Sequence, residues 1–310
     1  MPEGYTHIRT ARQAAEFAGI QPKDPAAFGA GANGPDPLFC YQVWKPAAKR
    51  TENLPVLGQR LHQENTGAFL ASLIAGARTP TQRSYVLGFL CHYATDCVMH
   101  PYVAAVTQPG EAYGMPGGHG YFEIALDSEL HRIDTRDPAV RVRDNTPALN
   151  KTQRAEIAQL LQQAILEALG VEVSCQALMD SYQHTRLLRR MFVSRFGIKY
   201  RLFQLLEPMF GGKGFITGHV TPAKLKKNQL PAQWQNPYTM EYNGEGIYQL
   251  LEQAQRRSAG CMIAARQVWD GKRPLEDAMD VIGSNNYDTG LPDEESAPTP
   301  LRKTYEGAYI

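Results

Sequence analysis

Apolar residues recur three and four positions apart along most of this 310-residue chain. That spacing places them on one face of a helix and therefore predicts amphipathic helices. Thr79-Pro80 and Asp24-Pro25 are each typical of a helix start, with a capping residue followed by proline. No run of residues alternates as a half-buried strand would, so we expect an all-α fold. The predicted helices cover residues 6–17, 54–77, 85–98, 119–133, 151–169, 174–192 and 245–269.

Glycine, proline and amide residues interrupt this helical pattern in several places. Residues 29–37, 107–118, 210–218 and 227–238 are rich in them and are predicted to be loops. From Ser284 onward the sequence is polar and contains several prolines, which predicts a loosely ordered tail over 284–310. Residues 1–283 are then expected to form a single all-α domain.

The longest apolar stretch, residues 85–106, contains three ionisable side chains at intervals of four: His92, Asp96 and His100. Four residues advance a helix by about 400°, so the three share one face. Burying an ionisable group is costly unless it is paired or bound to a metal. A metal site is therefore one explanation of this stripe.

The length of the stripe bears on how many ions it could serve. At a rise of ~1.5 Å per residue, His92 and His100 stand ~12 Å apart along the helix axis. Zinc bonds to nitrogen and oxygen are only ~2.0–2.2 Å long, so one ion does not reach both histidines. Asp96 lies between them and has two oxygens, one for an ion on either side. The stripe therefore predicts at least two metal ions.

A second pair of the same kind follows two glycines. His119 and Glu123 are four residues apart, and together with His100 they form a His-His-Glu set, the ligand class of an open catalytic zinc. A single pair with this spacing is more typical of a surface ion pair on a helix. Two such sets on apolar helices favour metal binding.

Three upstream residues are further candidate ligands, although each has an ordinary explanation when taken alone. Asp36 follows a glycine-rich turn and is typical of a turn or N-cap residue. His62 is either a surface residue or a ligand, and His7 is an ordinary residue for the first turn of a helix. The remaining histidines have no partners at metal spacing, so we expect structural or surface roles for His131, His184 and His219.

Composition limits the class of protein. The formal charge of +1, from 32 Lys and Arg against 31 Asp and Glu, argues against binding to duplex nucleic acid. The five cysteines form no CxxC motif and are predicted to be buried thiols in a reducing compartment. The N-terminus lacks the apolar core of a signal peptide, and ionisable residues interrupt the longest apolar stretch. We therefore expect a cytoplasmic protein without a transmembrane segment.

Three segments resemble the zinc-dependent phospholipase C family, which is related in fold to the S1/P1 nucleases. They are Thr6-His7, the stretch LGFLCHYATDCVMHP at 87–101 and the stretch GHGYFE at 118–123. The resemblance covers roughly residues 1–130. It implies a divergent cytoplasmic member of bacterial type, with an all-α domain and up to three zinc ions.

The resemblance also implies which residues bind the ions. The third site would use the terminal amine of Pro2, if the initiator methionine is removed. The implied zinc ligands are Asp36, His62, His92 and Asp96 for the first ion, His100, His119 and Glu123 for the second, and Asp96, His7 and Pro2 for the third.

The activity implied by the resemblance is that of a multinuclear phosphodiesterase of phospholipase C type. A zinc-bound hydroxide would attack phosphorus, and Asp36 would orient the attacking water or take its proton. The expected substrate is a small phosphodiester or a phospholipid head group.

Two alternatives stay open at this point. One is a single-strand nuclease or nucleotidase of S1/P1 type, which would expose aromatic platforms for bases. The loop 107–118 contains a single aromatic residue, Tyr113, on which a base could stack. The other is a non-catalytic, zinc-stabilised interaction module, in which protein atoms would fill every coordination position of the metal.

Overall fold

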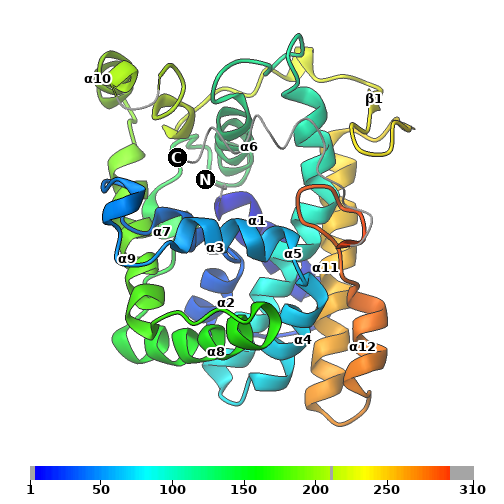
Figure 1. Ribbon diagram of the computed structural model, residues 1–310. Helices are drawn as coiled ribbons and strands as arrows, with labels where there is room; N and C mark the ends of the chain where they lie inside the picture. Colours follow the sequence, from blue (N-terminus) through cyan, green and yellow to red (C-terminus); the bar gives the residue numbers. More distant parts are fainter. Residues whose placement is uncertain (1–3, 210–211, 294–310) are drawn as a thin grey trace.

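The computed structural model describes residues 4–209 and 212–293, which fold mainly into helices (Figure 1). The expected all-α class is confirmed. The α-helices of the described residues are α1 Gly4–Phe17, α2 Pro25–Gly31, α3 Leu54–Gln63, α4 Thr66–Gly76, α5 Pro80–Val106, α6 Gly118–Thr135, α7 Val142–Asn145, α8 Lys151–Leu169, α9 Cys175–Phe192, α10 Ile198–Leu206, α11 Ile247–Trp269 and α12 Leu275–Ile282.

Short elements connect these helices. The 3₁₀ turns are η1 Asp36–Cys40, η2 Ala47–Lys49, η3 Glu207–Met209, η4 Thr217–His219 and η5 Lys227–Gln229. Strands β1 Trp234–Gln235 and β2 Tyr242–Asn243 pair in antiparallel fashion, with Trp234 opposite Asn243. The sequence pattern missed this small sheet because two residues are too few to show an alternation.

Helix α5 is the centre of the fold. Thr79 caps its first turn by accepting a hydrogen bond from the Gln82 backbone N–H at 3.1 Å, as the Thr-Pro pair predicted. The helix packs against α1, α2, α8 and α11, and it supplies buried residues to all three apolar clusters of the core. It extends beyond the predicted range 85–98 at both ends.

Two glycines bring α2 unusually close to α5. A Cβ atom at Gly31 would lie 2.0 Å from the Tyr85 carbonyl oxygen, and one at Gly88 would lie 2.1 Å from the Phe28 carbonyl oxygen. Since neither position has room for a side chain, the two helix backbones touch directly. This contact carries the chain that follows α2 to the ionisable face of α5.

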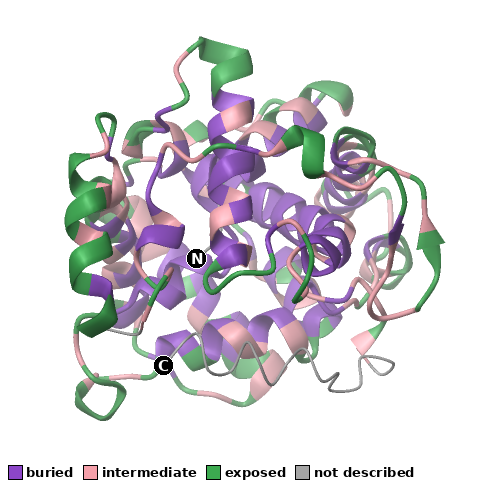
Figure 2. Ribbon diagram, turned by 90° about the horizontal axis from the view of Figure 1, so that it is seen from above, coloured by how far each residue is buried: buried purple, intermediate pink, exposed green. Residues whose placement is uncertain are grey.

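Two differences from the predicted helices have a local cause. The range 54–77 divides into α3 and α4 because Asn65 adopts a left-handed conformation with φ of 50°. Helix α10 was not predicted, and most of its apolar residues are exposed rather than part of the core. Figure 2 shows the general arrangement, in which the inner helix faces are buried and the outer faces are exposed.

The segment after α12 does not meet the expectation of loose ordering over residues 284–293. Tyr287 is fully buried and belongs to the largest apolar cluster. Asp293 accepts a hydrogen bond of 2.8 Å from the Thr66 backbone N–H. Residues 294–310 of the predicted tail lie outside the described residues.

Two other expectations concern the state of the cysteines and the presence of a transmembrane segment. All the cysteines are free; Cys175 is partly exposed and the other four are buried. Within residues 4–209 and 212–293, no helix combines the length and the apolar character that crossing a bilayer requires.

Candidate metal centre

Three ionisable side chains of α5 share one face, as their spacing predicted. His92 and Asp96 are almost completely buried, and His100 is partly exposed. Asp96 Oδ2 lies 2.9 Å from His92 Nε2, whereas Asp96 Oδ1 lies 3.7 Å from His100 Nε2. The two carboxylate oxygens therefore face opposite directions along the helix.

The turn after α2 brings Asp36 to this face. Gly34 has a φ of +51°, and a Cβ atom there would lie 2.1 Å from His92 Cδ2. Only glycine therefore lets the turn pass so close to the imidazole. Asp36 Oδ2 lies 3.6 Å from His92 Nδ1.

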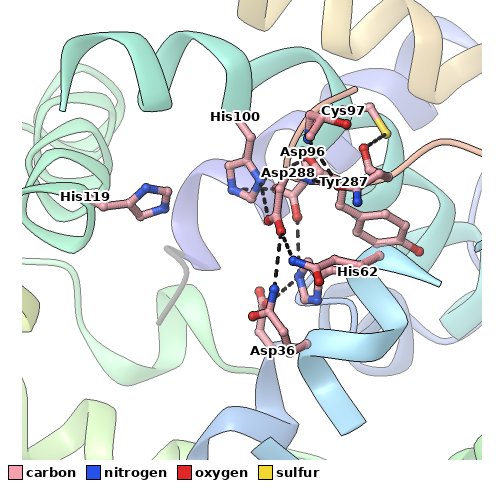
Figure 3. Close-up of polar contacts among 12 residues, drawn as sticks. Asp36, His62, Asp96, Cys97, His100, His119, Tyr287 and Asp288 are labelled. Carbon is pink, nitrogen blue, oxygen red and sulfur yellow. Dashed lines mark hydrogen bonds and ion pairs between the residues drawn. The ribbon is translucent and has the colours of Figure 1, made fainter. Parts of the chain in front are cut away.

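His62, in the last turn of α3, completes this side of the cluster (Figure 3). Its Nδ1 lies 2.8 Å from the Gly58 carbonyl oxygen, which can only accept a hydrogen bond. This contact leaves Nε2 as the free nitrogen, 3.4 Å from Asp36 Oδ1 and 3.8 Å from Asp96 Oδ2. A carbonyl on one imidazole nitrogen is the usual support of a metal-binding histidine.

His7 approaches Asp96 from α1. Its Nε2 lies 3.2 Å from Asp96 Oδ1, and its ring lies against that of His92 with centroids 4.4 Å apart. The start of α1 is fixed by the buried Asp127 of α6, which accepts hydrogen bonds from the Tyr5 and Thr6 backbone N–H groups at 2.9 and 2.6 Å. Pro2, the predicted terminal ligand, lies outside the described residues.

A second set of donors lies beyond His100, where α6 begins. His119 Nε2 lies 2.9 Å from Glu123 Oε1, and His100 Nε2 lies 3.5 Å from the same oxygen. Figure 3 shows His119 on its own helix, facing His100 across a gap. The His-His-Glu set predicted from the sequence is thus brought together by two helices.

The eight candidate ligands among the described residues fall into three groups, each with its donor atoms within 4.8 Å of one another. The division differs from the one that the resemblance implied. His92 is shared by two groups, and His7 joins Asp36 as well as approaching Asp96. The groups are His7, Asp36 and His92; His62, His92 and Asp96; and His100, His119 and Glu123.

Several atoms of these groups are buried without any hydrogen-bond partner among the described residues. They include both oxygens of Asp36, both ring nitrogens of His92, Asp96 Oδ2 and Glu123 Oε2. A buried polar atom without a partner is costly, and such atoms are rare in folded proteins. Zinc prefers nitrogen and oxygen donors of this kind, so the residues fit the metal.

Asp96 and His100 stabilise each other's charged form. Burial alone would raise the pKa of Asp96, but the neighbouring charges of His100, His92 and His7 outweigh it and lower that pKa well below its usual value. Burial alone would lower the pKa of His100, and Asp96 and Glu123 instead raise it to about 10. Metal ions would take the place of these protons, so binding should release them.

Two residues at the centre were missed by sequence reasoning because they lie in the predicted tail. The Tyr287 ring packs on His62 with centroids 5.1 Å apart, and the Tyr287 carbonyl oxygen lies 3.1 Å from His100 Nδ1. Asp288 Oδ1 lies 3.6 Å from the same nitrogen, and Gln63 donates to Asp288 Oδ2 at 2.6 Å. No spacing in the sequence connects these residues with α5.

His219 is a further histidine near the second set. A Cβ atom at Gly120 would lie 2.6 Å from His219 Cε1, so its ring rests directly on the first turn of α6. Burial lowers the pKa of His219 to about 3, which keeps the imidazole neutral. It lies outside the three groups above and is not a predicted ligand.

A comparison with known protein families identifies the family of the chain. A family model described as zinc dependent phospholipase C matches residues 6–168, more than half of the chain. The chain belongs to this zinc-dependent phospholipase C family. All eight candidate ligands of this family member lie within the match, whereas η4, α10 and the segment around Tyr287 lie outside it. No curated protein and no solved structure matches the chain.

Proposed function

We propose that this family member is a multinuclear zinc-dependent hydrolase that cleaves phosphodiesters of phospholipid type. The observation that carries the proposal is the position of Asp96. Its two buried oxygens face different imidazoles, with His7 and His100 near Oδ1, and His62 and His92 near Oδ2. A carboxylate in this position suits a bridge between two metal ions.

The set of His100, His119 and Glu123 is the best candidate for the substrate side. Their side chains are 12%, 21% and 11% exposed, whereas that of His92 is fully buried. Three protein ligands leave a fourth position of a tetrahedral zinc open for water or substrate. This exposure favours an enzyme over a zinc-stabilised interaction module.

Bound zinc would act as a Lewis acid toward phosphoryl oxygens and would lower the pKa of water from 15.7 to about 7. Asp36 is the proposed residue for orienting that water or accepting its proton. Both its oxygens are free of hydrogen bonds, and the carboxylate is almost completely buried. Pro2 and His7 stay proposed ligands of a third ion.

The nuclease alternative finds less support. Tyr113, the aromatic residue that the loop 107–118 offered for base stacking, is fully buried. Its hydroxyl accepts a hydrogen bond from the Lys226 backbone N–H at 2.6 Å, so the side chain belongs to the packed interior. Base stacking requires an exposed ring.

A substrate panel tests the proposed function. Protein with bound zinc is incubated with a water-soluble phosphodiester, with phosphatidylcholine in mixed micelles and with a single-stranded oligonucleotide. We expect hydrolysis of the first two, with the phosphorylated head group released from the lipid. Rapid cleavage of the oligonucleotide without action on the lipid would favour the nuclease, and no hydrolysis of any of them would reject an enzyme acting on phosphodiesters.

A further inference from the structure

Helix α10 presents apolar side chains to the solvent. None of its residues is buried, and Ile198 and Leu205 are 74% and 77% exposed. Phe196 before the helix and Met209 after it are exposed to a similar extent. Figure 1 shows α10 standing at the outer edge of the molecule, at the upper left. Exposed apolar side chains gathered in this way mark a surface that meets another phase or a partner.

The helix is amphipathic, with its apolar stripe turned away from the protein. At about 100° per residue, Ile198, Leu202 and Leu205 lie within about 60° of one another. The opposite side faces the body, because the Phe203 ring packs on Phe192 with centroids 6.0 Å apart. A core helix has the reverse arrangement.

Basic side chains border the apolar stripe. On the same helical projection Lys199 lies on one side of it and Arg201 on the other, and both are exposed. Residues 181–240 contain ten lysines and arginines, although the net charge of the whole chain is only +1. The single acidic residue of that stretch, Glu207, is buried and accepts a hydrogen bond from the Thr217 backbone N–H at 2.9 Å.

This surface is connected to the second set of candidate ligands. The chain after α10 packs backbone to backbone on the turn before α6, since a Cβ atom at Gly117 would lie 2.3 Å from the Gly214 carbonyl oxygen. It then enters η4, whose His219 rests against Gly120, the residue after His119. His119 is the most exposed of the candidate ligands.

We propose that the α10 surface docks on an anionic lipid bilayer. We define this surface as Phe196, Ile198, Leu202, Leu205 and Met209 with the flanking Lys199 and Arg201. An apolar face that enters the head-group region, bordered by cations that meet anionic lipids, is the usual construction of an interfacial helix. The inference rests on the proposed function only in that docking would bring lipid head groups to the His119 side of the metal centre.

Flotation with lipid vesicles tests the docking without any turnover. The wild-type protein should bind vesicles that contain phosphatidylglycerol, and should bind vesicles of pure phosphatidylcholine much less. Added salt should weaken binding, because it screens the attraction to anionic lipid. Zinc-stripped protein should bind the phosphatidylglycerol vesicles as well as the zinc-bound protein does.

Two double variants separate the apolar contribution to vesicle binding from the charged contribution. Ile198→Ser with Leu205→Ser, and Lys199→Glu with Arg201→Glu, should each weaken vesicle binding by about tenfold or more. The matched control is Phe17→Ser with Val281→Ser, which removes exposed apolar side chains from α1 and α12. That control should bind as the wild type does, and thermal melting should show that all variants are folded.

Other outcomes would overturn the docking. Vesicle binding that is absent, or unchanged in both α10 variants, would contradict it. Failure of vesicle binding together with a dimer that Ile198→Ser and Leu205→Ser dissociate would assign the surface to a second copy of the chain. Oligonucleotide binding lost only in the charge variant would assign it to nucleic acid. Hydrolysis of the water-soluble phosphodiester should be the same in all variants, so loss of docking and loss of the proposed activity are separate results.

Discussion

At the scale of single residues, Asp96 has the most consequential position. Asp96→Asn keeps the shape of the side chain but removes the negative charge that two groups of imidazoles share. We expect the variant to lose at least part of its zinc and to lower turnover by about 100-fold or more. Zinc analysis and the phosphodiester assay measure the two effects.

The matched control for this change is Asp134→Asn. Asp134 also pairs with a basic residue, Arg9 at 2.7 Å, but it belongs to none of the three groups of candidate ligands. Its zinc content and turnover should stay near those of the wild type. An Asp96→Asn protein with full zinc and full activity would show that Asp96 is only a structural helix residue.

His119 and Glu123 should behave as one unit. His119→Ala and Glu123→Ala are each expected to empty the same ion site, since their side chains are in contact at 2.9 Å. The double variant should then lose little more activity than either single one, because removing one partner already disables the site. His184→Ala is the control and should leave the zinc content unchanged. Losses that simply add would mean that the two residues do not share an ion.

At the scale of elements, the helical period accounts for what could be predicted. The stripe of His92, Asp96 and His100 follows from the sequence because a helix fixes the angle between residues four apart. The placement of Asp36 beside His92 depends on the touching backbones of α2 and α5, which is a long-range contact without a local signal. The resemblance to a family, not the spacing, supplied that part of the candidate site.

The parts that could not be predicted share a physical cause. Tyr287 lies in a polar segment that gains its order from contacts with α3 and α5, so its own composition indicated a loose tail. The spacing of apolar residues predicts which face of a helix is buried only when that face packs on the core. The apolar stripe of α10 faces the solvent instead, so its spacing did not indicate its position.

The loop after α10 depends on one buried carboxylate. Glu207 accepts hydrogen bonds from the Gly214 and Thr217 backbone N–H groups at 3.0 and 2.9 Å. Burial would raise the pKa of Glu207, but these hydrogen bonds outweigh it and lower the pKa below its usual value. A lowered pKa means that the ionised form stabilises the fold above the usual pKa of about 4.5, and that this contribution is lost as the pH falls through the lowered value.

Glu207→Gln tests this dependence. At neutral pH the variant should be less stable than the wild type by about 1–3 kcal/mol, because charged hydrogen bonds to the backbone are weakened. The difference should begin to shrink as the pH falls below about 4.5, where Glu207 of the unfolded chain takes up a proton, and should be lost as the pH falls through the lowered pKa of the folded protein. Chemical denaturation at a series of pH values measures it, and a difference that stays constant with pH would contradict the assignment.

At the scale of the whole molecule, a helical scaffold brings ionisable groups together around α5. Three groups of donors lie along this helix, and several of their buried atoms have no hydrogen-bond partner among the described residues. Because zinc would bind the folded state and satisfy these atoms, its removal should lower the melting temperature as well as the activity.

Metal analysis of protein purified without chelator, combined with stripping and reconstitution, is the decisive experiment for a multinuclear zinc centre. We expect about two to three zinc ions per chain, in line with the three groups of donors. Hydrolysis of the water-soluble phosphodiester and several degrees of thermal stability should be lost on stripping and restored by added zinc. A chain that carries one ion or none, or one whose hydrolysis survives complete removal of zinc, would contradict a multinuclear zinc hydrolase.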